Sequence, residues 1–151
     1  MTPHDDEEVT DSPTGWVAHH IRTYVESGGE KGHLYQGLPT LLLTTRGRRT
    51  GTLRRTALIY GRDGDRHLLV ASNGGAPRHP AWYLNLVAHP DVFLQVGPEK
   101  FAARARVATA EEKPPLWRLM ASVFPRYDDY RTRTDRDIPL VILERLPDRH
   151  P

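Results

Sequence analysis

Short apolar segments joined by tight turns dominate the middle of this chain, and they limit the folds that it can adopt. Five segments have the length and composition of β-strands: residues 39–46, 53–60, 67–72, 92–96 and 101–108. The Asp63-Gly64 pair between the second and third segments is typical of a hairpin turn. Because most neighbouring segments are joined so closely, the pattern predicts a mostly antiparallel, barrel-like α+β domain and not a doubly wound sheet.

Helical patterns occur at the start of the chain, in one crossover and before a last strand. Apolar side chains recur at helical spacing over residues 14–26, and residues 80–88 form a second, shorter helical pattern. Thr109 and Glu112 have the spacing of a capping box, which predicts that a third helix begins there. Residues 138–144 have the pattern of the final strand. We expect the helices to pack on the outside of the barrel.

The 151 residues suit one domain, which we place at residues 14–151 behind a flexible acidic tail of residues 1–13. The chain contains no cysteine, which excludes disulfides, thiolate nucleophiles and cysteine-based metal sites. Its histidines do not have the spacing of a metal-binding helix, so no metal site is expected. The polar start has no signal-peptide pattern and the apolar runs are too short to cross a bilayer, which together predict a cytoplasmic protein.

Five arginines lie between Arg46 and Arg55, around a turn that contains Gly47 and Gly51. The two glycines allow backbone N–H groups to converge on an anion, and arginine side chains can bind phosphate or carboxylate. A basic hairpin that only faces solvent is an equal alternative on composition. Neither GxxxxGK(S/T) nor GxGxxG after a strand is present, which argues against a Walker-type or Rossmann nucleotide site.

Two further segments are candidates for a ligand site. Residues 72–80 form a Gly-rich turn from a strand into a helix, where backbone N–H groups favour anions and electron-rich rings. Tyr127 and Tyr130 share a face if their segment is helical, and can then line a pocket and donate hydrogen bonds. A plain loop and a packed surface turn are the alternatives. The residues alone thus predict an anion-binding barrel without a covalent nucleophile or a metal.

Six segments of the chain, in order, resemble the deazaflavin-dependent nitroreductase family of actinobacteria. They are residues 41–51, 60–64, 71–76, 79–86, 127–130 and 133–139. The resemblance covers about residues 38–144, which is most of the chain. It implies a split β-barrel and the coenzyme F420, a 5-deazaflavin whose phosphate and oligoglutamate tail are anionic.

The resemblance also implies roles for residues of this chain. Those implied to bind the phosphate and tail, or to shape their turn, are Arg48, Arg49, Thr50, Gly51, Thr52 and Arg54. Those implied to contact the deazaflavin ring, or to support its wall, are Val70, Ala71, Ser72, Asn73, Gly74, Gly75, Ala76, Trp82 and Asn85. The implied catalytic residues are Ser72, Tyr127 and Tyr130, which would hydrogen-bond the acceptor or supply a proton. Asn73 stands where relatives usually carry Lys, and Phe124 where they carry a third tyrosine.

On this basis we expect an oxidoreductase that transfers hydride from reduced F420 to a quinone, a nitroaromatic or an enone. FMN on the same barrel is the nearest alternative, because its phosphate also suits the arginine turn. A carrier that binds the coenzyme without turnover is another. A nucleic-acid-binding hairpin at residues 46–55 is disfavoured, because its arginines lack interleaved aromatic residues. Homodimer formation and peripheral membrane contact through the first helix stay open at this point.

Overall fold

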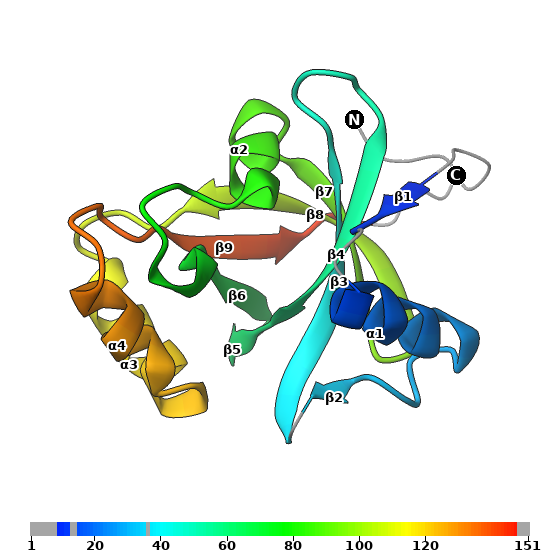
Figure 1. The fold of residues 1–151 in the computed structure, drawn as a ribbon, viewed down its shortest axis with the longest axis horizontal. Helices are drawn as coiled ribbons and strands as arrows, with labels where there is room; N and C mark the ends of the chain where they lie inside the picture. Colours follow the sequence, from blue (N-terminus) through cyan, green and yellow to red (C-terminus); the bar gives the residue numbers. More distant parts are fainter. Residues whose placement is uncertain (1–8, 13–14, 36, 148–151) are drawn as a thin grey trace.

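A computed structural model describes residues 9–12, 15–35 and 37–147 of the chain (Figure 1). Within these residues, the α-helices are α1 Gly15–Glu26, α2 Ala81–Ala88, α3 Lys113–Val123 and α4 Arg126–Thr132. The strands are β1 Val9–Asp11, β2 Leu34–Tyr35, β3 Leu38–Arg46, β4 Leu53–Ile59, β5 Gly61–Asp63, β6 Arg66–Val70, β7 Asp91–Val96, β8 Glu99–Val107 and β9 Leu140–Arg145. This is the mixed α+β class that the sequence predicts.

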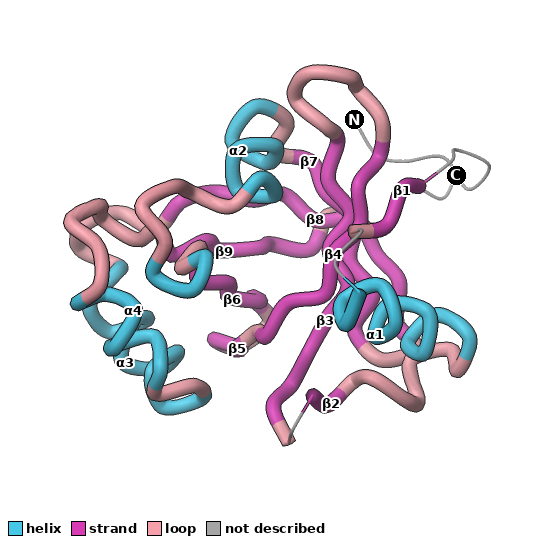
Figure 2. Tube along the Cα trace, viewed as in Figure 1, coloured by secondary structure: helices cyan, strands magenta, loops and turns pink. Residues whose placement is uncertain are grey.

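The strands form a sheet that closes on itself. Their order is β1-β4-β3-β7-β8-β9-β6-β5, and β2 pairs with the start of β3. Among the described residues, every pairing is antiparallel except that of β1 with β4. β5 follows β4 with only Tyr60 between them. β5 stands at one end of the strand order and β4 stands next to the other end, so this near-continuous connection closes the sheet. The strands therefore enclose a barrel, and the helices lie around its outside (Figure 2).

Alternate residues of the central strands pack into different hydrophobic clusters. On β9, Val141 and Leu143 belong to the cluster inside the barrel, whereas Leu140 and Ile142 pack under α3 and α4. β3 divides its side chains in the same way, between the barrel interior and α1. Because both faces of these strands are covered, their sequences are almost continuously apolar instead of alternating with polar residues.

α1 covers the outer face of the barrel at β3 and β4. Val17, Ile21 and Tyr24 form its buried face, and they cluster with Leu42 and Ala57. The apolar face of this helix is therefore used within the fold. None of the helices in the described ranges has the length and apolar character needed to cross a membrane.

Three short strands, β1, β2 and β5, lie outside the strand segments predicted from the sequence. β1 lies in the segment that we expected to be a flexible tail, so that expectation is wrong for residues 9–11. These residues pair in parallel with β4, which is more than forty residues away and leaves no local pattern in a polar sequence. β2 lies in a segment for which no strand was predicted. The rest of the predicted tail, residues 1–8 and 13, falls outside the described residues, as does residue 14.

The turn after α1 provides a test of the packing. Gly28 and Gly29 have φ of +63° and +87°, and a Cβ on Gly29 would lie 1.8 Å from the carbonyl oxygen of Gly97, whereas a Cβ on Gly28 meets open space. Gly28→Ala should cost about 1–2 kcal/mol of unfolding free energy, from the left-handed backbone alone. Gly29→Ala should cost about 1–3 kcal/mol more, because the backbone of Gly97 has to move. Urea denaturation measures both, and equal losses would contradict the close contact.

Candidate functional site

Two cavities are lined by residues of both strands and helices. The first, which we call the tyrosine cavity, has a volume of about 400 Å³. The predicted site residues that line it are Val70, Ser72, Asn73, Gly74, Trp82, Tyr127 and Tyr130. The second, which we call the arginine cavity, has a volume of about 420 Å³. The predicted site residues that line it are Arg48, Arg49, Thr50, Arg54, Trp82 and Asn85.

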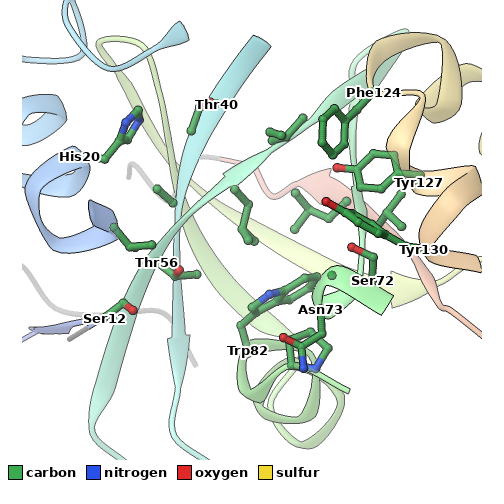
Figure 3. Close-up of a pocket in the computed structure, with 18 residues that line it drawn as sticks. Ser12, His20, Thr40, Thr56, Ser72, Asn73, Trp82, Phe124, Tyr127 and Tyr130 are labelled. Atoms are coloured by element: carbon green, nitrogen blue, oxygen red, sulfur yellow. The ribbon is translucent and has the colours of Figure 1, made fainter. Parts of the chain in front are cut away.

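The two cavities adjoin each other. Ser12, Thr56 and Trp82 line both of them. Figure 3 shows Ser12 and Thr56 on the side of Trp82 that is away from Tyr127 and Tyr130. A ligand with an aromatic head and an anionic tail can therefore occupy both cavities at once, with its middle part beside Trp82.

The arginine turn, residues 47–52, is shaped by its own backbone. The N–H of Gly47 donates to the carbonyl oxygen of Thr52 at 2.7 Å, and the N–H of Gly51 donates to that of Gly47 at 2.9 Å. Gly51 has a φ of +75°, in the left-handed region that favours glycine. The hydroxyl groups of Thr50 and Thr52 are hydrogen-bonded at 2.7 Å. Gly51 and Thr52 thus form the turn that presents the arginines.

Asn85 on α2 connects this helix to the arginine turn. Its Oδ1 accepts hydrogen bonds from the backbone N and from Nη1 of Arg48, both at 3.1 Å, and its Nδ2 donates to Oγ1 of Thr45 at 3.3 Å. The three bonds satisfy a side chain that is buried in the protein. We expected Asn85 to support the wall of the ring, but the structure places it at the arginine cavity, where it orients Arg48.

The Gly-rich turn after β6 contains three consecutive left-handed residues. The φ angles are +49° at Asn73, +63° at Gly74 and +81° at Gly75. Asn73 tolerates this conformation better than most residues, and its Nδ2 donates to the carbonyl oxygen of Arg78 at 3.0 Å. A Cβ on Gly75 would lie 3.1 Å from the carbonyl oxygen of Tyr130. The turn is therefore held directly against α4, which carries the tyrosines.

Arg136 braces the same turn, a role that no local pattern in the sequence indicates. Its guanidinium donates to the carbonyl oxygens of Ala71, Ser72 and Ala76, at 3.1, 2.5 and 2.8 Å. Its Nη1 also lies 2.9 Å from Nδ1 of His79. Burial and the charge of Arg136 lower the pKa of His79, so that the neutral ring can accept this hydrogen bond. One cation thus holds three carbonyl groups of the turn in place.

Replacing Arg136 with alanine should lower the free energy of unfolding by about 2–4 kcal/mol, because the three carbonyl groups lose a charged donor. Urea denaturation measures this loss. Arg118→Ala, at an exposed position of α3, is the matched control and should change stability by less than about 0.5 kcal/mol. Similar effects of the two substitutions would contradict a bracing role for Arg136.

Phe124, Tyr127 and Tyr130 form an aromatic wall of the tyrosine cavity. Their ring centroids lie 5.0 Å apart for Phe124 and Tyr127, and 6.4 Å apart for the two tyrosines. Both tyrosines belong to α4, so the helical interpretation of this segment is confirmed. Nε1 of Trp117 donates to Oδ1 of Asp128 at 2.7 Å, which fastens α4 to α3. Figure 3 shows the hydroxyl groups of the two tyrosines pointing into the cavity, with that of Ser72 nearby.

Burial keeps the phenol of Tyr127 protonated. The side chain is almost fully buried, and this burial, with a smaller contribution from Tyr130, raises the pKa of Tyr127 well above its usual range. A phenol that stays protonated at neutral pH donates a hydrogen bond and does not act as a base. The site therefore offers hydroxyl donors in one cavity and guanidinium groups in the other.

Some predicted residues shape the site without reaching it. Five of the predicted site residues line neither cavity, namely Gly51, Thr52, Ala71, Gly75 and Ala76. Conversely, Ser12, His20 and Thr56 line cavities without having been predicted. They come from three separate parts of the chain, and only the closed barrel with α1 on its surface brings them to the site.

Comparison with known proteins decides the family. A family model described as F420H(2)-dependent quinone reductase matches residues 16–145. The chain belongs to this family. It is 43% identical over 130 residues to the F420H(2)-dependent quinone reductase Rv1261c of Mycobacterium tuberculosis (strain ATCC 25618 / H37Rv), and the match covers 83% of this chain and 87% of that protein. The resemblance to deazaflavin-dependent reductases is thereby confirmed.

Solved structures agree with this F420H(2)-dependent quinone reductase assignment. The structure of an F420-H2 dependent reductase, FDR-A, is similar with a TM-score of 0.66 and 38% identity, over 70% of this chain and 94% of that one. A structure described as a domain-swapped dimer is similar with a TM-score of 0.69 and 36% identity, over 88% of this chain and 100% of that one. The predicted split β-barrel is confirmed for this family member.

Proposed function

We propose that this member of the quinone reductase family transfers hydride from reduced F420 to a quinone. The observation that carries the proposal is the junction of the two cavities at Ser12, Thr56 and Trp82. It joins a cationic site for a long anionic tail to an aromatic, hydroxyl-lined site for a ring and its acceptor. The family match supports both the coenzyme and the reaction.

The arginine cavity fits the anionic part of F420. Arg48, Arg49 and Arg54 line it, and Thr50 adds a hydroxyl group. A guanidinium group binds phosphate or carboxylate through two parallel hydrogen bonds, and Asn85 already orients that of Arg48. These residues would hold the phosphate and the start of the oligoglutamate tail.

The tyrosine cavity fits the deazaflavin ring and a planar acceptor. Val70, the turn that starts at Ser72, and Trp82 would hold the ring. When bound, the deazaflavin supplies the hydride. The protein orients the two partners, and the phenols of Tyr127 and Tyr130 donate hydrogen bonds to a quinone oxygen, on which negative charge grows during reduction.

The acceptor range, assembly and location follow as further proposals. Phe124 places an apolar ring beside the two phenols, which supports a planar aromatic acceptor. Nitroaromatics and enones, like quinones, carry an oxygen atom that gains negative charge during reduction, so we propose them as further acceptors.

A homodimer is supported by the similar structure described as a domain-swapped dimer. A cytoplasmic location stays a prediction from the sequence. Membrane contact through α1 is disfavoured, because the apolar face of α1 packs on the barrel.

A fluorescence titration of the purified protein with F420, repeated with FMN, tests the coenzyme. We expect saturable binding of F420 and weaker binding of FMN, because FMN lacks the oligoglutamate tail that the arginines would hold. Tighter binding of FMN than of F420 would reject the proposal in favour of a flavin protein on the same barrel.

A further inference from the structure

The arginine cavity contains a carboxylate, although its proposed ligand is anionic. Asp11 lines this cavity together with Arg55. The two side chains form an ion pair with two hydrogen bonds, from Nε of Arg55 to Oδ1 at 2.6 Å and from Nη2 to Oδ2 at 3.1 Å. A carboxylate without a cationic partner at this position would repel a phosphate or a glutamate. The ion pair offsets this repulsion, and it occupies one edge of the Arg55 guanidinium.

The ion pair also fastens β1 onto β4. β1 is three residues long, and its register pairs Asp11 with Arg55. A backbone hydrogen bond joins the same two segments, since the N–H of Ser12, the residue after Asp11, donates to the carbonyl oxygen of Arg55 at 2.9 Å. The side chains of Asp11 and Arg55 are only 31% and 24% exposed, so water screens their attraction less than on an open surface. Arg55 therefore holds this segment through both its side chain and its backbone.

The segment fastened in this way forms part of the proposed binding site. Thr10, Asp11 and Ser12 all line the arginine cavity, and Ser12 also reaches the tyrosine cavity. We propose that Asp11 is a positioning residue, which holds β1 as a wall over the tail of the coenzyme through its ion pair with Arg55. Direct contacts with the tail are left to Arg48, Arg49 and Arg54. This inference rests on the proposed function.

Asp11→Asn in the full-length protein tests the inference. The amide keeps one acceptor oxygen but loses the negative charge and the second acceptor, so the side-chain attachment of β1 to β4 is weakened. The Kd of F420 and the KM of its reduced form should rise about tenfold, which corresponds to the loss of about 1.4 kcal/mol. The kcat and the KM of the quinone should stay within about twofold, because α1 and the tyrosine wall are held by cores of their own.

Two further variants separate positioning from general stability. The charge exchange Asp11→Arg with Arg55→Asp recreates the pair in reverse, and it should restore most of the coenzyme affinity that Asp11→Asn loses. Glu99→Gln removes the partner of Arg145 in an ion pair of 2.6 Å that lines neither cavity. This control should leave the Kd of F420 unchanged.

An unchanged Kd for F420 in Asp11→Asn would overturn the inference. Tighter binding would overturn it as well, since Asp11 would then only be withholding Arg55 from the ligand. Equal losses of affinity in Asp11→Asn and in the charge-exchanged protein would also count against it. If the unmodified protein fails to bind F420, the proposed function itself is wrong, which keeps the two failures distinct.

Discussion

Replacing Arg48 with alanine should weaken the binding of F420 by about tenfold to a hundredfold. Hydrogen bonds to charged groups contribute about 1.5–3 kcal/mol, and each 1.4 kcal/mol corresponds to a factor of ten in Kd. The substitution keeps the backbone hydrogen bond from residue 48 to Asn85, so the arginine turn should retain its shape. Arg54→Ala, on β4 in the same cavity, should have an effect in the same range.

The specificity of this loss is as informative as its size. A deazaflavin without the phosphate and oligoglutamate groups cannot use the arginine cavity, so its binding should be nearly equal in wild type and Arg48→Ala. Arg104→Ala, on β8 with its side chain 60% exposed, is the matched control and should not change the binding of F420. Equal weakening for the coenzyme and the truncated deazaflavin would place the tail elsewhere.

Removing the hydroxyl groups of Tyr127 and Tyr130 together should lower kcat with a quinone by about a hundredfold. Removing one positioned hydrogen-bond donor to an oxygen that gains negative charge costs roughly 10²–10³ in rate, and the phenylalanine rings preserve the aromatic wall. The Kd of F420 should stay within about twofold, because the arginine cavity is untouched. Steady-state kinetics and the fluorescence titration measure these two quantities, and a parallel change in both would indicate a structural role for the tyrosines.

The pH dependence gives an independent check on Tyr127. Its pKa is raised above the ordinary value of about 10, so the phenol remains protonated over the whole neutral range. The kcat of the wild-type protein should therefore show no decline from loss of this proton between about pH 7 and pH 9. A decline in that range which is absent from Tyr127→Phe would contradict the proposed state of the phenol.

Local patterns were sufficient to predict most of the barrel. Alternation and turn residues depend on near neighbours, so the five central strands, the α1 segment and the capping box could be read directly. In that box, the N–H of Thr109 donates to Glu112 at 2.9 Å, and the N–H of Glu112 donates to Thr109 at 3.2 Å. β1 could not be predicted, because its pairing with β4 depends on a distant partner and not on its own composition.

Candidate site residues could be predicted from the sequence where they lie in one continuous segment. Arg48, Arg49 and Thr50 line the arginine cavity, and Tyr127 and Tyr130 line the tyrosine cavity. Arg136 and Asp11 were missed, since each acts through contacts with segments far away in the sequence, and a single charged residue in a polar stretch has no pattern. Asn85 was expected at the wall of the ring, and its contact with the arginine turn could not be predicted, because only the fold brings α2 against that turn.

The central claim is tested most directly by following the oxidation of reduced F420 by the purified protein in the presence of a soluble quinone. We expect turnover that saturates with both the coenzyme and the quinone, and whose kcat falls by about a hundredfold when both tyrosines are changed to phenylalanine. Tight binding of F420 without turnover on any quinone, nitroaromatic or enone would contradict the account, and would instead identify the protein as a carrier of the coenzyme.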